Sequence, residues 1–398
     1  MANRPQTFIT LAVATVIAGC NGKSVMRSSP NAEATAQWNA ARASAMSGLA
    51  ADQLRDGNFD KCQATLDQVL RLTPDDVNLH MLAAKLSIEQ GRLELADAHL
   101  TKARQLDPKR AETDYLSGLL LERWQKFDRA QAAYADAASK NPTEPAYLLA
   151  QAETLVAMRK PTDALALLEA GRKTFEHNGV VVHEIGVLQA KLGRVSDGVD
   201  SLREACRLMP DDPTVREHLG FALFASDRYA DAAEVFERLV KNDEYAKRPD
   251  VFAALGECLT RSQRHAEAKA AYDTATRLDA AMPGYWVGLA RTSLAAGDVP
   301  SADNALRKAV ALRPTDVPTQ YLVGYVRLKQ NLLPQALAAF KVASDADPAD
   351  GDAWCLQGYV LAQSNRPAEA KACFARALAI RPDSPLAGRL LTTITPAD

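Results

Sequence analysis

Aromatic residues make up only 6% of this 398-residue sequence, and the chain has almost no excess of one charge. Lysine and arginine number 47 against 49 acidic residues, which gives a formal net charge of -2 at pH 7. A protein that binds nucleic acid or an anionic membrane over a broad surface needs a basic excess. We therefore expect neither mode of binding, and no nucleic-acid partner.

Long hydrophobic runs are also missing after the N-terminal segment. A helix that crosses a bilayer needs about 20 consecutive apolar residues. No segment beyond the first 20 residues approaches that length. The body of the chain is therefore not expected to span a membrane.

The motifs that support catalysis are absent as well. The sequence has no glycine-rich phosphate loop, no nucleophile elbow and no paired-histidine metal motif. Its six histidines are scattered, and the closest pair in sequence, His177 and His183, has no nearby cysteine to complete a ligand set. We expect no enzyme activity, no cofactor and no metal site.

The chain does contain a repeat with a period of 34 residues. Self-similarity at this period is the mark of a solenoid of helix–turn–helix units. Between Pro210 and Pro314 the register carries two additional residues. The prolines that mark the period fall in two evenly spaced runs, Pro74, Pro108 and Pro142, and Pro314, Pro348 and Pro382. Ten units begin at Ala43, Val77, Ala111, Pro145, Gly179, Pro213, Pro249, Pro283, Val317 and Gly351, and the last ends at Ser384.

Two positions of the unit are small in every copy, because two antiparallel helices must approach closely there. The eighth position holds Ala50, Ala84, Gly118, Ala152, Gly186, Gly220, Gly256, Ala290, Gly324 and Gly358. The twentieth holds Cys62, Ala96, Ala130, Ala164, Gly198, Ala232, Ala268, Ala302, Ala336 and Ala370. The proline near the end of the unit stops the second helix, since it lacks an amide donor. Gly91 and Gly297 fall at the turn between helices, where a left-handed residue ends the first helix.

This pattern resembles the tetratricopeptide repeat (TPR) family over residues 43–384. The copy that follows the family pattern best contains Ala353, Trp354, Gly358, Ala370, Phe374, Ala377 and Pro382. Three copies depart from it by replacing the proline with Glu176, Glu244 or Ala280. The resemblance implies an all-α, right-handed superhelical solenoid of ten repeats.

The first 20 residues form a separate segment. Arg4 supplies a positive start, residues 8–18 form a short apolar run, and Ile17-Ala18-Gly19-Cys20 closes it. This pattern indicates a secretory signal over residues 1–19. Its ending resembles a bacterial lipobox, which implies that Cys20 is lipidated (palmitate labelling would detect this) and becomes the mature N-terminus. An ordinary cleaved signal with a chance cysteine, or a fortuitous apolar N-terminus, are the alternatives.

The lipobox resemblance also implies a location. Acyl chains contribute about 0.8 kcal/mol per buried methylene, so two or three of them hold a protein firmly on a membrane. Asn21 follows the cysteine, and a residue other than aspartate there favours sorting to the outer membrane. We expect a lipid-anchored protein at the periplasmic face of the outer membrane.

The remaining boundaries follow from the repeat register. Residues 20–42 are expected to be the lipid anchor and linker, with a helix beginning near 33–38. Residues 43–246 form repeats 1–6, and residues 247–384 form a short insertion plus repeats 7–10. Residues 385–398 are a capping helix and tail, because a terminal unit must cover its exposed face. The charged, longer connection between repeats 6 and 7 is expected to be poorly packed.

Five cysteines remain beside Cys20, so an oxidising compartment leaves at least one free thiol. Cys62 and Cys258 occupy apolar positions, where we expect them to act as small hydrophobes. Cys355 and Cys373 lie on the two helices of one repeat, so a disulfide between them remains open.

In TPR proteins, the second, fifth, ninth and twelfth positions of each first helix line a concave groove. Aromatic side chains there would suit an extended or helical peptide, although each ring could instead pack against the adjacent repeat. The residues expected to contact a partner are Tyr115, Leu119, Phe221, Phe224, Tyr321, Tyr325 and Tyr359. Charged residues expected between them are Lys85, Glu153, Glu257 and Arg291. The asparagine of the family's carboxylate clamp and the asparagine ladder of its sugar-transferase members are absent.

These observations predict a non-catalytic, membrane-anchored scaffold that binds protein or peptide partners in its groove. By similarity to the TPR lipoproteins of tight-adherence pili, it would assist assembly of an envelope complex of the pilus or secretion type. An accessory subunit for exopolysaccharide synthesis or export, or a recruiter of envelope hydrolases, are the alternatives.

Overall fold

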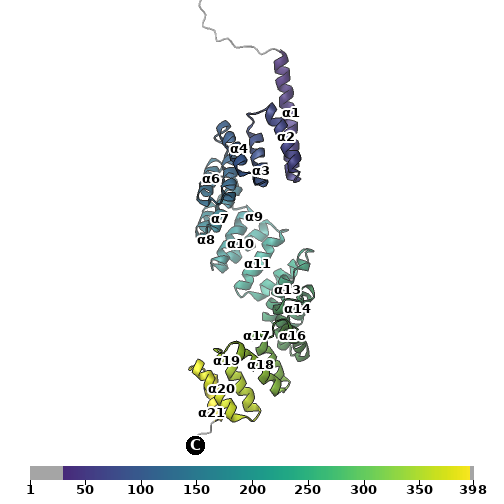
Figure 1. Cartoon of the computed structure of the whole chain (residues 1–398), viewed down its shortest axis with the longest axis vertical. Helices are drawn as coiled ribbons and strands as arrows, with labels where there is room; N and C mark the ends of the chain where they lie inside the picture. The colour runs from purple at the N-terminus through teal and green to yellow at the C-terminus, as the bar shows by residue number, and fades with distance from the viewer. Residues whose placement is uncertain (1–29, 395–398) are drawn as a thin grey trace, which may run out of the picture. The chain divides into compact units, whose positions relative to one another are not determined.

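The computed structural model describes residues 30–394, and over this range it contains helices and connecting turns only. Consecutive helices form antiparallel pairs, one pair per repeat (Figure 1). The all-α repeat solenoid is therefore confirmed. The described part of the chain divides into two compact units, with the boundary between residues 140 and 141.

From residue 30 onward, the first unit contains six helices: α1 (Pro30–Arg55), α2 (Phe59–Leu72), α3 (Val77–Glu89), α4 (Leu93–Leu106), α5 (Ala111–Arg123) and α6 (Phe127–Lys140). The second contains α7 (Pro145–Ala157), α8 (Pro161–Gly171), α9 (Gly179–Lys191), α10 (Val195–Leu208), α11 (Pro213–Ala225), α12 (Tyr229–Leu239), the 3-10 turn η1 (Tyr245–Lys247), α13 (Pro249–Arg261), α14 (His265–Leu278), α15 (Pro283–Ala295), α16 (Val299–Leu312), α17 (Val317–Lys329), α18 (Leu333–Ala346), α19 (Gly351–Gln363), α20 (Pro367–Ile380) and α21 (Pro385–Ile394).

The first helices of nine repeats begin at the residue that the repeat register predicts, from Val77 of α3 to Gly351 of α19. The first repeat differs, because α1 begins at Pro30, ahead of Ala43. The stretch expected to be a linker is therefore helical from Pro30 onward. Cys20 and the signal segment lie outside the described residues.

The small positions of the repeat meet at the crossing of its two helices. All twenty residues at the eighth and twentieth positions are buried. The side chain at the twenty-fourth position fills the space beside the eighth: Phe236 lies against Gly220, and Leu306 packs beside Ala290. A Cβ added to Gly220 would lie 2.7 Å from the Phe236 ring, so the glycine is required by size.

The turn between the two helices has the same backbone conformation in all ten repeats. Its fifteenth position has a positive φ between 57° and 84° throughout, although only four of these residues are glycine. In the second repeat, the amide of Arg92 donates to the carbonyl of Ser87 at 2.8 Å, which ends α3 in a Schellman motif. The non-glycine residues at this position are Gln125, Arg159, Asp227, Gln263, Asn331 and Asn365.

The C-terminal helix α21 covers the last repeat, as the sequence predicts. Ala387 is fully buried, and Leu390 and Leu391 pack against the cluster around Phe374. Leu386 remains half exposed. The helix thus removes most of the apolar face of the last repeat from water.

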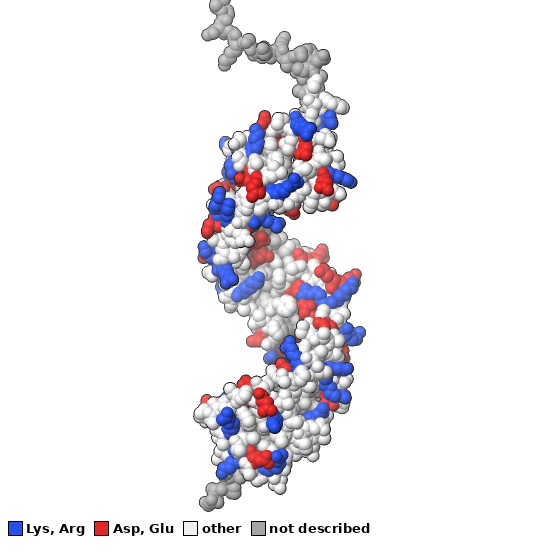
Figure 2. All heavy atoms as spheres, viewed as in Figure 1, with Lys and Arg blue, Asp and Glu red and all other residues white. Residues whose placement is uncertain are grey.

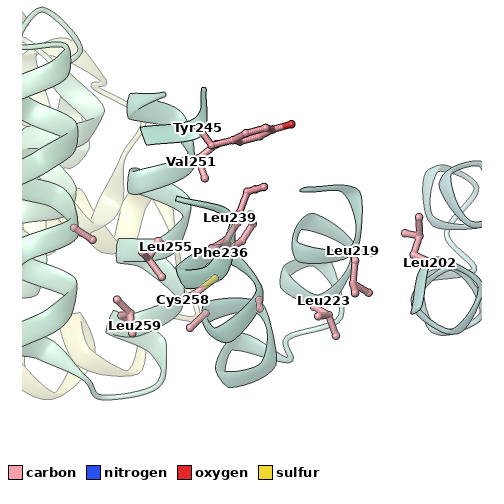
Figure 3. Packing of buried hydrophobic residues seen from close by; sticks show 14 of the residues in the cluster. Leu202, Leu219, Leu223, Phe236, Leu239, Tyr245, Val251, Leu255, Cys258 and Leu259 are labelled. Atoms are coloured by element: carbon pink, nitrogen blue, oxygen red, sulfur yellow. The ribbon is translucent and has the colours of Figure 1, made fainter. Parts of the chain in front are cut away.

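The connection between repeats 6 and 7 corrects the expectation of a poorly packed joint. The two additional residues allow the turn η1, which places Tyr245 beside Val251 with only 4% of its surface exposed (Figure 3). The Tyr245 hydroxyl donates to Glu217 at 2.8 Å, and Arg248 forms an ion pair with the same carboxylate at 2.8 Å. The joint is therefore apolar inside and closed by a hydrogen-bonded ion pair.

The visible surface carries acidic and basic side chains in alternation (Figure 2). This matches the near-zero net charge, and it leaves no single-sign patch on the viewed face. None of the helices within residues 30–394 is long and apolar enough to cross a membrane.

Candidate partner-binding surface

The seven predicted contact residues fall into both units. Tyr115 and Leu119 lie on α5, are partly buried and pack against the core cluster around Leu116. The Tyr115 ring is tilted against that of Tyr134, with centroids 5.7 Å apart. Tyr115 and Leu119 therefore contribute to the packing between repeats 2 and 3.

Phe221 and Phe224 project from α11 in different ways. Phe224 is partly buried and meets Tyr229 edge to face at 5.5 Å. Phe221 is 38% exposed. Its ring meets that of Phe236 edge to face, with the ring centroids 5.2 Å apart. Of the two, Phe221 offers a surface to a partner.

Tyr321 on α17 is held in place by two neighbours. Its hydroxyl donates to Asp350, the residue that caps α19, and its ring lies 6.3 Å from that of Phe340. Burial, and then the Asp350 carboxylate, raise the pKa of the Tyr321 hydroxyl. Tyr321 thus links repeats 9 and 10. It does not line the cavity beside Tyr325 and Tyr359.

Tyr325 on α17 and Tyr359 on α19 occupy equivalent positions one repeat apart. They are 47% and 36% exposed, and together with Leu328, Lys329, Leu356 and Gln363 they line a cavity of about 360 Å³. We call this the two-tyrosine pocket. The Gln363 side-chain amide donates to the Tyr359 hydroxyl at 2.7 Å, and the Lys329 ammonium lies 5.4 Å from the centroid of the Tyr325 ring.

The chemistry of the pocket is that of a binding surface. Two rings and two leucines offer apolar contact, while Lys329 and Gln363 add hydrogen-bond donors at the edge. Such a surface can hold a short apolar side chain and bind a neighbouring carbonyl or carboxylate. It contains no nucleophile paired with a base.

The charged residues expected along the groove are engaged with their neighbours. Lys85 forms an ion pair with Glu112 at 2.8 Å. Glu257 accepts a hydrogen bond from the Tyr272 hydroxyl at 3.0 Å and pairs with Arg291 of the next repeat. These contacts tie successive first helices together.

A smaller cavity that the sequence analysis did not single out lies between α7 and α9. It has a volume of about 160 Å³ and is lined in part by Glu153, Val156, Leu188 and Lys191. Val156 is 41% exposed and occupies the twelfth position of its repeat. The repeat register would have identified it, but its aliphatic side chain gave no reason to select it.

The cysteines within residues 30–394 remain unpaired, whereas four of the six histidines lie in two close pairs. The five cysteines within residues 30–394 are free thiols, so the Cys355–Cys373 disulfide is not formed. Burial raises the pKa of the Cys258 thiol to about 12, so it stays protonated at neutral pH. No group of three or more metal-ligating side chains occurs in the described part of the chain.

The histidine pairs are not those that sequence proximity suggested. His183 Nε2 lies 2.7 Å from His218 Nδ1, and His80 Nδ1 lies 3.1 Å from His99 Nδ1. His177 Nε2 lies 3.5 Å from a carboxylate oxygen of Glu176 and is not paired with His183. The partners are 35 and 19 residues apart, so only the folded repeats bring them together.

Comparison with known proteins identifies the family. The tetratricopeptide repeat model matches residues 47–111, 183–249, 253–317 and 321–385, more than half of the chain. The chain belongs to the tetratricopeptide repeat family. TPR proteins bind protein or peptide partners, and their fold is typically a non-catalytic scaffold. The search of curated proteins returned no match.

Several solved structures of TPR proteins are similar to this chain. The C-terminal part of a TPR repeat-containing protein from Cytophaga hutchinsonii matches with a TM-score of 0.51 and 14% identity, covering 60% of this chain and 98% of its own. YrrB, a TPR protein with an unusual peptide-binding site, matches at 0.41 and 19%, covering 48% and 97%. The Cut9–Hcn1 complex matches at 0.42 and 13%, covering 90% and 97%.

Proposed function

We propose that this TPR protein is a non-catalytic scaffold that holds a peptide segment of a partner in the two-tyrosine pocket. The observation that carries the proposal is the pair Tyr325 and Tyr359, exposed on successive first helices beside one cavity. Large apolar side chains that are exposed next to one another mark interaction sites, whereas single ones are common on any protein surface.

The pocket favours a peptide for two reasons. Tyrosine rings supply a large contact area at little cost in side-chain entropy, and tyrosine is enriched among residues that dominate binding energy. Lys329 and Gln363 place donors beside the rings, where they can bind main-chain carbonyls. An extended segment can therefore set an apolar side chain in the pocket and its backbone along the edge.

We further propose that the array is attached by lipid at Cys20 to the periplasmic face of the outer membrane. The sequence Ile17-Ala18-Gly19-Cys20 supports this. The anchored scaffold would assist assembly of an envelope complex of the pilus or secretion type. Recruitment of envelope hydrolases would use the same pocket with a different partner.

A role as an accessory subunit for exopolysaccharide synthesis or export is the second candidate. Exposed tyrosine faces, such as that of Tyr325, can stack on sugar rings as well as on peptides. The nature of the bound molecule distinguishes the two candidates.

The test compares three variants of the full-length protein expressed in a bacterial envelope. In Tyr325→Ala/Tyr359→Ala, the partner that copurifies with the wild type should bind at least about 30-fold more weakly, because each ring is a candidate hot spot. The matched control is Leu278→Ala/Leu312→Ala, which removes two leucines of similar exposure from second helices. Tyr321→Phe keeps the ring but removes the bond to Asp350.

We expect the leucine control to bind normally and the double tyrosine variant to keep its helical content and melting temperature. Tyr321→Phe should lower the melting temperature and leave binding unchanged. A polysaccharide as the molecule lost from the tyrosine variant would favour the second candidate. Equal losses in the tyrosine and leucine variants would refute the pocket.

A further inference from the structure

Two histidines of the second repeat face each other across its helix pair. His80 lies on α3 and His99 on α4, and their Nδ1 atoms are 3.1 Å apart. The rings are tilted by 41°, and both side chains are only partly buried. The two nitrogens are therefore close together in a place that solvent ions can reach.

The tautomer of His80 follows from its other nitrogen. His80 Nε2 lies 2.8 Å from the carbonyl oxygen of Pro74. A carbonyl can only accept, so Nε2 carries the proton and Nδ1 of neutral His80 presents a lone pair to His99. In the metal-free protein, the proton between the two rings therefore belongs to His99 Nδ1.

His80 has the hydrogen-bonding arrangement that histidine ligands of metals usually adopt. A metal-bound histidine usually donates its second ring N–H to a carbonyl or carboxylate, which fixes the ring orientation. Two nitrogens bound to one zinc ion at about 2.0–2.1 Å lie about 2.8–3.4 Å apart for bond angles between 90° and tetrahedral. The separation of 3.1 Å between His80 and His99 falls within that range.

The charges around the pair favour a cation. Asp67 acts on His99 and Asp75 on His80 through their carboxylate charges. Asp75 also forms an ion pair with Lys102 at 2.8 Å, so it shares its charge with that lysine.

We propose that His80 and His99 form a two-histidine chelate for a divalent transition-metal ion, with zinc as the fitting representative. The ion takes the place of the shared proton and is bound by both Nδ1 atoms after the rings rotate toward it. His99 changes tautomer as its proton passes from Nδ1 to Nε2 through water, so no proton is lost overall. Water, or a nearby carboxylate, completes the coordination, since the protein supplies two nitrogens.

The second histidine pair provides an internal contrast. His183 Nε2 and His218 Nδ1 are 2.7 Å apart, the distance of a short hydrogen bond. His183 Nδ1 is also paired with Glu184 at 3.2 Å, and His183 is only 8% exposed. In this pair one ring is buried and is also held by Glu184, so the pair is expected to remain a hydrogen bond and not to take up metal.

The test is a zinc titration of the full-length protein in mild detergent, read by competition with a chromophoric chelator and by the ring resonances of the histidines. The wild type should bind one ion at this site and shift the resonances of both His80 and His99. His80→Ala and His99→Ala should each lower the zinc affinity of the site by about tenfold or more, since even removal of an outer-shell partner costs that much. His177→Ala and His218→Gln are the controls, and both should bind zinc as the wild type does.

The cysteines can also bind zinc, but every variant contains the same ones, so differences between variants isolate the histidine site. Circular dichroism and melting of the metal-free variants show whether they are folded, and His99→Gln replaces His99→Ala if the latter is not. The proposal is wrong if His80 and His99 do not shift with zinc, if neither substitution lowers the affinity, or if His218→Gln lowers it equally.

Discussion

Gly358 on α19 and Phe374 on α20 form a matched pair: a Cβ added to the glycine would lie 2.7 Å from the Phe374 ring. The same pairing recurs along the chain: wherever the twenty-fourth residue of a repeat is aromatic, the eighth residue is glycine. Where the twenty-fourth residue is leucine, the eighth is alanine in four of five repeats, as in Ala290 and Leu306. The two positions therefore share a fixed volume.

We predict that Gly358→Ala destabilises the last repeats by about 1–3 kcal/mol, the usual cost of overpacking. Phe374→Leu alone should also destabilise, because it leaves a space beside the glycine. The double variant recreates the Ala290–Leu306 pair and should recover at least about 1 kcal/mol relative to additivity. Urea unfolding of the four proteins measures this, and strict additivity of the two changes would contradict the shared-volume interpretation.

The joint between repeats 6 and 7 should resist proteases in the wild type. Tyr245→Ala is expected to cost about 3–5 kcal/mol, because it empties a buried aromatic site. Tyr245→Phe should cost about 0.5–1.5 kcal/mol, since it removes only the hydrogen bond to Glu217. Limited proteolysis checks the same point: cleavage at Lys247 or Arg248 should become early only in Tyr245→Ala. Early cleavage there in the wild type would restore the idea of a weak joint.

Stability should fall as the pH is lowered from 7.5 to 5.5. Burial, followed by the charge of His183, lowers the pKa of His218 from its ordinary value of 6.5. The folded state thus binds fewer protons than the unfolded state, so stability is full above about pH 6.5 and is lost as the pH falls through the folded pKa. Burial likewise lowers the pKa of His99.

The matched variant is His218→Gln, which removes one titrating group. Its midpoint of urea unfolding should depend less on pH than that of the wild type over this range, with His99 accounting for part of the remaining slope. An identical slope in the two proteins would show that His218 titrates normally.

Lipidation at Cys20 remains a prediction from the sequence. Cys20→Ser should abolish palmitate labelling and leave an uncleaved or soluble precursor, because the thiol is the attachment point of the lipid. Cys206→Ser is the control, since it alters a partly buried thiol within the array. Unchanged labelling and membrane fractionation of Cys20→Ser would contradict the lipobox interpretation.

Much of the fold could be predicted because the same sequence pattern occurs in ten consecutive repeats. The helix starts, the buried small positions and the capping helix follow from spacing alone. The turn position was harder to recognise. Gly91 and Gly297 indicate a left-handed residue, but Arg159 and Gln263 adopt the same conformation without a sequence signal. Tertiary packing of the helix pair imposes that conformation on residues that disfavour it.

The candidate binding surface was less predictable. The groove positions identify Tyr321, Tyr325 and Tyr359 equally, yet Tyr321 bonds to Asp350 while the other two face a cavity. The ring of each residue is the same, and the difference lies in the neighbour that its hydroxyl reaches. Such contacts join residues about one repeat apart, so periodicity does not reveal them.

The sequence by itself determined the repeat, its family and the small-residue crossings, since these depend on spacing and side-chain volume. Only the tertiary structure decided which groove residues are exposed, that Tyr245 closes the joint, and that His80 meets His99 and His183 meets His218. These outcomes depend on side-chain rotamers and on contacts between helices. Local sequence patterns do not specify them, because the packing of neighbouring repeats selects them.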